Sequence, residues 1–174
     1  MISPAHVRAM AAYNAEMNRR LYGAAATLTE AQRREDGGAF FGSIHATLCH
    51  LLWGDGLWMH RFAGWERPAG GIAESTRLVE GWDELRAARA AQDARMQAWA
   101  ATLTPADLEG DLTWLSGATG QEMRRPRWLL ITHMFNHQTH HRGQVHALLT
   151  RAGARVGDTD LPWVITAADW AEGG

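Results

Sequence analysis

Hydrophobic positions along the chain recur mostly at the spacing of α-helices, and long runs with strand-like alternation are scarce. Ser3 followed by Pro4 is typical of a helix start, because serine caps free backbone N–H groups and proline fits the first turn. Gly153 is typical of the residue just after a helix end. The pattern predicts four long helices, over residues 4–27, 41–62, 82–103 and 126–152.

The segments between these helices predict shorter elements. "TEAQ" at 29–32 resembles a capping box and predicts a short helical turn. Glycine and proline punctuate residues 64–81, which indicates a loop. "LTWLSGATGQEMRR" at 112–125 has a glycine-rich centre between short flanks, a pattern that favours a small β-hairpin. We therefore predict an all-α fold, a four-helix bundle with long connections and one small hairpin.

Length and composition are those of an ordinary globular protein. The chain has 174 residues, 46% of them hydrophobic and 21% charged, which predicts a single domain over residues 1–174. A formal charge of −2 without a basic stripe argues against nucleic-acid binding. Residues 37–54 lack Asp, Glu, Lys and Arg, but their two histidines and four glycines favour a buried helix over a membrane span. We expect a cytoplasmic protein without a membrane partner.

Five of the nine histidines crowd into "THMFNHQTHHRGQVH" at 132–146. At about 100° per residue, His137 and His141 fall on one face of the predicted helix, His133 and His140 lie at its edge, and His146 points away. The same face carries hydrophobic residues: Leu130, Met134, Val145 and Leu148. Residues four apart on a helix have Cβ atoms about 5–6 Å apart, so two imidazoles could bind one ion.

A third ligand would have to come from another helix, and His45, His50 and His60 are the candidates in 41–62. His50 lies on a face with small and apolar residues, where Gly54 leaves room beside it, whereas His45 and His60 point elsewhere. A neutral histidine hydrogen-bonded in the core is the common alternative for each of these residues. From spacing alone, that alternative and metal binding remain equally open.

Several other metal sites can be dismissed from the sequence. Cys49 is the only cysteine, which excludes a cysteine-rich zinc site. Gln138, not glutamate, follows His137, so the metalloprotease pattern is incomplete. The chain has no Glu-x-x-His motif, as a di-iron bundle would require. Asp55 lies about 140° around the helix from His50, which favours a capping or bridging role over direct ligation.

Four segments resemble the DinB family of the DinB/YfiT-like metalloprotein superfamily: "NHQTHHRGQVHALL" at 136–149, "CHLLWGDGLWMHRF" at 49–62, "TDLPW" at 159–163 and "NRRLYGAAATL" at 18–28. The resemblance covers nearly the whole chain, and "NHQTHHRGQ" is its most specific part. It implies a four-helix bundle of unusual connectivity, often dimeric, with a divalent ion held by three histidines. Those positions correspond here to His50, His137 and His141.

The resemblance also implies a range of functions. Zinc, nickel and iron(II) all suit imidazole ligands. Relatives in the wider superfamily are thiol-dependent transferases and isomerases, and others resemble hydrolases. We therefore expect a homodimeric metal-dependent enzyme of stress or detoxification metabolism, with a small-molecule substrate for which a low-molecular-weight thiol is a candidate. The alternative is a non-enzymatic stress-induced protein with a structural metal.

Three further residues of the histidine motif have roles that the sequence leaves open. Gly143 costs about 1 kcal/mol relative to alanine inside a helix, which suggests a close helix approach. Arg142 could be a structural ion-pair donor or a substrate contact. Gln144 could support a metal ligand or line a pocket.

The sequence also leaves open the roles of two histidines and two tryptophans near the predicted site. His133 and His140 could orient ligands or substrate, or be solvated at the edge of the helix. Trp53 and Trp58 flank the His50 face and could line an apolar pocket, although aromatic residues at helical spacing more often belong to the core.

Overall fold

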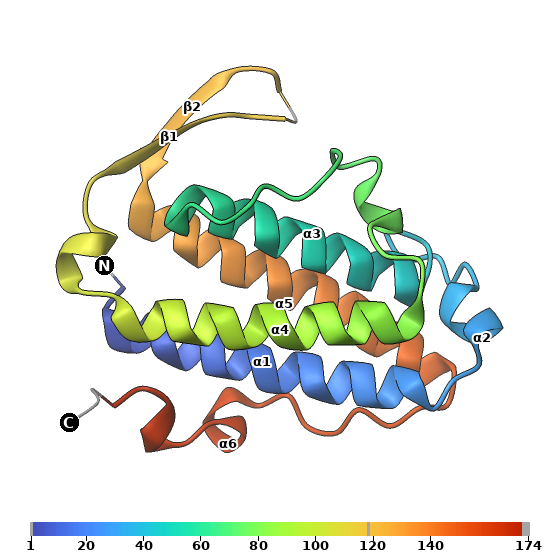
Figure 1. Ribbon diagram of the computed structural model, residues 1–174. Coiled ribbons are helices and arrows are strands. Elements are labelled where there is room, and N and C mark those ends of the chain that lie inside the picture. Colours follow the sequence, from blue (N-terminus) through green and yellow to red (C-terminus); the bar gives the residue numbers. More distant parts are fainter. Residues whose placement is uncertain (1, 118, 172–174) are drawn as a thin grey trace.

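Four long helices form a bundle in the computed structural model, which describes residues 2–117 and 119–171 (Figure 1). They are α1 (Pro4–Ala26), α3 (Ile44–Ala63), α4 (Trp82–Thr102) and α5 (Arg127–Arg151). α1 packs against α4 and α5, and α3 packs against the same two helices. α1 and α3 therefore lie diagonally across the bundle although they are the first two long helices of the chain. The all-α prediction is confirmed, and the connectivity departs from a simple up-and-down order.

α3 begins three residues later than predicted. Ser43 caps it, because its hydroxyl oxygen accepts a hydrogen bond of 3.1 Å from the backbone N–H of Ala46. Gly42, with a φ of 76°, ends a tight turn just before this cap. Phe41, predicted as the first residue of the helix, instead lies in the preceding loop.

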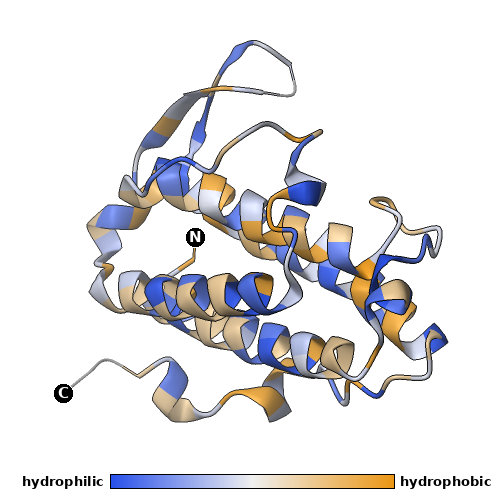
Figure 2. Cartoon of the chain, turned by 45° about the vertical axis from the view of Figure 1, so that its right-hand side comes forward, coloured by the Kyte–Doolittle hydropathy of each residue, from blue (hydrophilic) through white to orange (hydrophobic). Residues whose placement is uncertain are grey.

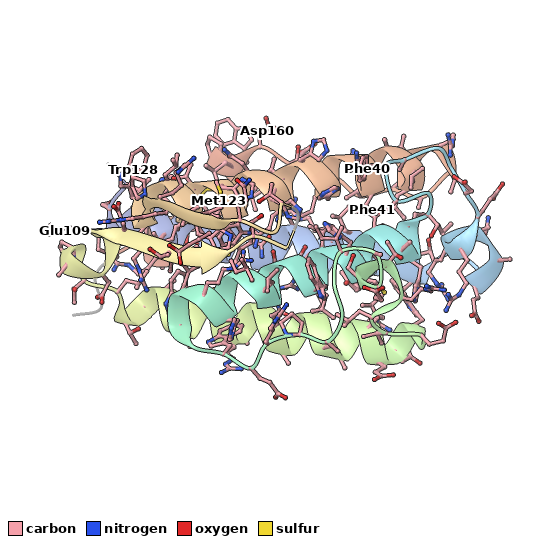
Figure 3. The ribbon with its side chains drawn as sticks, turned by 90° about the horizontal axis from the view of Figure 1, so that it is seen from above. Phe40, Phe41, Glu109, Met123, Trp128 and Asp160 are labelled. Atoms are coloured by element: carbon pink, nitrogen blue, oxygen red, sulfur yellow. The ribbon has the colours of Figure 1, made fainter. Side chains whose placement is uncertain are left out.

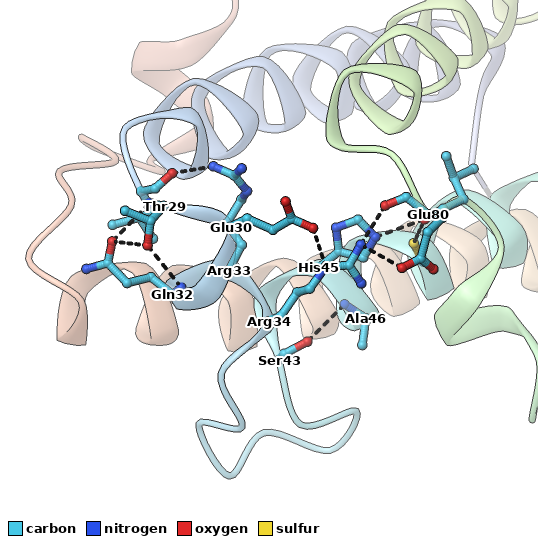
Figure 4. Close-up of polar contacts among 12 residues, drawn as sticks. Thr29, Glu30, Gln32, Arg33, Arg34, Ser43, His45, Ala46 and Glu80 are labelled. Atoms are coloured by element: carbon cyan, nitrogen blue, oxygen red, sulfur yellow. Dashed lines mark hydrogen bonds and ion pairs between the residues drawn. The ribbon is translucent and has the colours of Figure 1, made fainter.

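The short elements also match the sequence pattern. α2 (Glu30–Arg34) starts with the predicted capping box between Thr29 and Gln32 (Figure 4). The hairpin consists of β1 (Asp111–Leu115) and β2 (Glu122–Pro126), paired antiparallel. The remaining turns are η1 (Ser75–Arg77), η2 (Pro105–Leu108), α6 (Leu161–Val164) and η3 (Ala167–Asp169). Of these, η1 lies within the segment predicted as loop, and it carries a residue that matters for the site.

Two hydrophobic clusters occupy the two ends of the bundle. One contains Leu48 and Leu149, and the other contains Met59 and Met134. Hydrophilic positions recur between hydrophobic ones along the long helices (Figure 2). Among the described residues, no helix is long and apolar enough to cross a membrane.

Buried polar residues separate the two clusters, and we call four of them the charged layer: Asp55, Arg89, Asp93 and Arg142. The Arg89 guanidinium lies 2.7 Å from a carboxylate oxygen of Asp55 on α3 and 2.7 Å from one of Asp93 on α4. Amide side chains of α1 complete the layer: Asn18 and Asn14 donate to Asp93, and Arg142 donates to Asn14. Two arginines and two aspartates thus balance one another inside the bundle.

Candidate metal centre

Three histidines converge between α3 and α5. One ring nitrogen from each of His50, His137 and His141 lies within 4.8 Å of the others, an arrangement that could hold a metal ion. The Nε2 atoms of His50 and His137 are 3.1 Å apart. Zn–N bonds of about 2.0–2.1 Å in a tetrahedral site would place two ligand nitrogens about 3.3 Å apart. We call this group the histidine cluster, and its donor set and spacing fit a divalent transition ion.

The tautomer of His50 follows from its contact with Ser75. The Nδ1 atom of His50 lies 2.8 Å from the Ser75 hydroxyl, and that hydroxyl donates its proton to the Ile72 carbonyl oxygen at 2.6 Å. Because a hydroxyl has only one proton, Ser75 must accept from His50 Nδ1–H. The Nε2 atom of His50 is then the nitrogen with a free lone pair, and it faces the cluster.

Gln144 has the same effect on His141. The side-chain oxygen of Gln144 accepts a hydrogen bond from His141 Nδ1 at 2.9 Å, while its NH₂ group lies 3.3 Å from Nε2 of His140. This orientation leaves Nε2 of His141 unprotonated. Of the two roles that the sequence left open for Gln144, the structure therefore favours support of a histidine ring. His140 is exposed and orients the glutamine.

His137 fits into a space made by a glycine. A Cβ atom at Gly54 would lie only 3.1 Å from Cε1 of His137, so a larger residue would displace this ring. The sequence predicted that Gly54 leaves room near the site, and the ring that uses this room belongs to His137. The Nδ1 atom of His137 is buried and has no hydrogen-bond partner among the described residues.

The environment keeps the three imidazoles neutral at neutral pH. Burial, followed by the neighbouring histidines, lowers the pKa of His50 to about 4 and that of His137 to about 3. Burial also lowers the pKa of His141. Because only the unprotonated imidazole binds a metal, this electrostatic environment favours metal binding over protonation.

Phe41 covers one side of the histidine cluster. Its ring centroid lies 4.0 Å from that of His50 and 5.2 Å from that of His141. Its neighbour Phe40 is 76% exposed, and both residues lie in the loop before α3 (Figure 3). This contact was not predicted from the sequence because Phe41 was expected in the helix, although the turn glycine Gly42 was an available signal.

A cavity of about 1090 Å³ opens on another side of the cluster, beside His50 and His137. α3, α5, the loop over residues 67–74 and the hairpin all contribute to its walls. Trp53, Trp58 and His133 line it, so the two tryptophans that could have been core residues form part of a pocket wall. The cluster can therefore be reached by a small molecule from this side.

The other candidate residues lie away from the cluster. Asp55 bridges to Arg89, as its angular position predicted, and Arg142 is a buried structural donor. His45 binds the Val79 carbonyl oxygen at 2.9 Å (Figure 4), and His60 binds that of Trp65 at 2.6 Å, so neither points to the cluster.

The prediction for Gly143 was wrong. A Cβ atom there would meet nothing within 4 Å, so the glycine does not mark a close helix approach. It lines a separate cavity of about 150 Å³ between α1 and α5, which Tyr13 and Val156 also line.

Comparison with known proteins gives a family but no curated relative. No match was found among curated proteins. The model of the DinB family matches residues 1–173, nearly the entire chain. This match includes both helices of the histidine cluster, and the protein therefore belongs to the DinB family.

Proposed function

We propose that the protein binds one divalent transition metal ion through His50, His137 and His141. The observation that carries this proposal is the convergence of three neutral imidazoles, two of which Ser75 and Gln144 hold in the tautomer that directs Nε2 toward the cluster. Zinc, nickel and iron(II) all suit three imidazole ligands.

We further propose that the site is catalytic. Among the described residues the metal-ligating group has three members, so a bound ion would keep a coordination position for a substrate. The ion would supply Lewis-acid chemistry and lower the pKa of a water or thiol that it binds. His50 and His137 line the large cavity, and this supports a small-molecule substrate. Transferase or isomerase chemistry with a low-molecular-weight thiol, or hydrolysis, fits such a site in stress or detoxification metabolism.

One observation favours a second function, in which the protein is a non-enzymatic stress protein and the metal is a structural clip. The histidine cluster joins α3 to α5, and Phe41 shields it from one side. A structural ion would raise the stability of the bundle without turnover of any substrate.

Elemental analysis of protein purified without added metal tests the ligand set. We expect about one ion per chain in the parent protein, and its loss in the variant His50→Ala/His137→Ala/His141→Ala. His146→Ala is the matched control, because His146 lies on α5 outside the cluster. Equal metal content in the triple variant would refute the assignment.

Chelation separates the two functions. A structural clip predicts a large fall in melting temperature on removal of the metal and no activity in thiol-transfer or hydrolase assays. A catalytic ion predicts activity that disappears with the chelator and returns when metal is restored. A homodimer remains a prediction from the family, and sedimentation of the metal-loaded chain would test it.

A further inference from the structure

The large cavity extends away from the histidine cluster along α3. Trp58 and Arg61 line it eight and eleven residues after His50. At 1.5 Å of rise per residue, these positions lie about 12–17 Å further along the helix. The cavity therefore has a histidine end and a second end near Arg61, and a ligand that filled both would have to be elongated.

Two arginines lie at the second end of the cavity. Arg61 and Arg67 both line the cavity, and neither makes a side-chain hydrogen bond or an ion pair with the described part of the chain. Burial lowers the pKa of Arg61, and the charge of Arg67 adds to this effect. Two unpaired like charges are unfavourable next to each other, and an anion between them would remove that cost.

Arg61 is held in place by aromatic rings. Its guanidinium carbon lies 4.5 Å from the ring centroid of Trp58 and 5.6 Å from that of Trp114 on the hairpin. Stacking on a ring face fixes the plane of the group and leaves its N–H edges available for a planar carboxylate. Unlike Arg61, the charged-layer residue Arg89 has its guanidinium engaged by carboxylates.

The lining between the two ends contains several aromatic rings. The ring of Trp58 meets those of His133 and Trp114 edge-on, at centroid distances of 5.3 and 5.8 Å. Among the described residues that line the cavity, Glu74 is the only acidic one, and its carboxylate accepts a hydrogen bond from the backbone N–H of Gly71 at 2.9 Å. The lining is thus cationic, although the chain as a whole has a formal charge of −2.

We propose that Arg61 and Arg67 form an anion subsite, which binds the carboxylate of an elongated aromatic ligand whose other end reaches His50 and His137. The subsite itself needs no metal, whereas its role in presenting a substrate to the histidines rests on the proposed metal-dependent function. Its chemistry selects for aryl compounds with a terminal carboxylate over neutral analogues of the same shape.

Calorimetric titration with two probes of matched shape tests the subsite: biphenyl-4-carboxylate and the neutral biphenyl-4-methanol. We expect the parent protein to bind the carboxylate more tightly, and Arg61→Gln and Arg67→Gln each to weaken that binding by about tenfold or more with little effect on the alcohol. Arg86→Gln, an exposed arginine of α4 outside the cavity, is the matched control and should change neither probe. Arg67 is exposed, so its variant should fold even if Arg61→Gln does not.

The triple histidine variant separates this inference from the proposed metal site. If the arginines bind the carboxylate, preference for the acid over the alcohol persists in that variant. The proposed subsite would be overturned if the triple histidine variant lost its preference for the acid while Arg61→Gln and Arg67→Gln kept the parent affinity. That result would mean that a metal ion had bound the probe. Equal affinity of the parent for both probes, or no binding of the acid at millimolar concentration, would also overturn it.

Discussion

The histidine cluster and the charged layer share the helices α3 and α5, and the layer also takes Arg89 and Asp93 from α4. The two regions differ in how their polar groups are used. Gln138 directly follows His137, and Arg142 directly follows His141. Consecutive residues of a helix point about 100° apart, so one of each pair reaches the cluster while the next lies among the buried polar residues of the bundle. A single stretch of α5 therefore contributes residues to two neighbouring polar regions.

Burial does not separate these regions cleanly, because His50 and His141 are as buried as Asp93 and Arg142, although His137 is only half-buried. The two regions differ in whether their polar groups are paired with opposite charges. Arg89 faces two carboxylates, and charge is balanced inside the layer. The histidine cluster instead brings three ring nitrogens to a common point, where Nε2 of His50 lies 3.1 Å from Nε2 of His137, while Ser75 and Gln144 bind the opposite ring nitrogens of His50 and His141. Buried opposite charges that neutralise one another indicate structure, and neutral ring nitrogens that converge without a counter-charge indicate a site.

The largest effect should come from breaking the charged layer. Arg89→Leu leaves Asp55 and Asp93 without their shared cation, and we expect a loss of about 3–5 kcal/mol in the free energy of unfolding. Arg86→Leu, three residues earlier on α4, removes only an exposed pair with Asp83 and should cost less than about 1 kcal/mol. Urea unfolding followed by circular dichroism measures both, and equal losses would mean that the layer has no special structural role.

The next largest effect should come from removing the hydroxyl that orients His50 in the histidine cluster. Ser75→Ala removes the acceptor that fixes the tautomer of His50, and metal affinity should fall about 10–100-fold. Thr47→Val is the matched control. Like Ser75, Thr47 has a buried hydroxyl that donates a hydrogen bond to a backbone carbonyl oxygen, and it lies on α3 with His50 but does not contact a histidine. Competition with a chromophoric chelator gives the affinities. An unchanged affinity in Ser75→Ala would show that Ser75 does not orient a ligand.

Acid should destabilise the metal-free protein through the histidine cluster. The pKa values of His50 and His137, about 4 and about 3, lie below the ordinary value of 6.5, so the unfolded chain binds protons first as pH falls. Stability contributed by the neutral rings is fully present above pH 6.5 and is lost as pH falls from there toward these values. Thermal melts from pH 7 to 5 should show a steeper decline for the parent than for His50→Ala/His137→Ala. Parallel declines would contradict this account.

A surface ion pair should have the smallest effect. Arg19 and Arg20 lower the pKa of Glu16 to about 2, but Arg19 is largely exposed. We expect Glu16→Gln to cost less than about 1 kcal/mol at neutral pH, and added salt to reduce that cost. The contribution of the glutamate is present above its ordinary pKa of 4.5 and disappears as pH falls through about 2. Urea unfolding at low and high salt measures it, and a loss comparable to that of Arg89→Leu would invalidate the distinction between buried and exposed pairs.

Much of the fold was predictable because it depends on local patterns. Helical periodicity, the Ser3 cap and the glycine-rich centre of the hairpin all act within a few residues of the chain, and the long helices end within a few residues of their predicted bounds. The start of α3 was misplaced because hydrophobic Phe40 and Phe41 extend the apolar pattern into a loop whose turn depends on the positive φ of Gly42.

The sequence by itself determined that His137 and His141 share a face of one helix, because a spacing of four residues allows no other arrangement in an α-helix. It also left His50 as the best candidate for a third partner. Only the tertiary structure decided that this ring meets the other two, that Ser75 and Gln144 set two tautomers, and that Phe41 and a cationic cavity border the group. The physical reason is that helix geometry is set by neighbouring residues, whereas contacts between helices and loops depend on how the whole bundle packs.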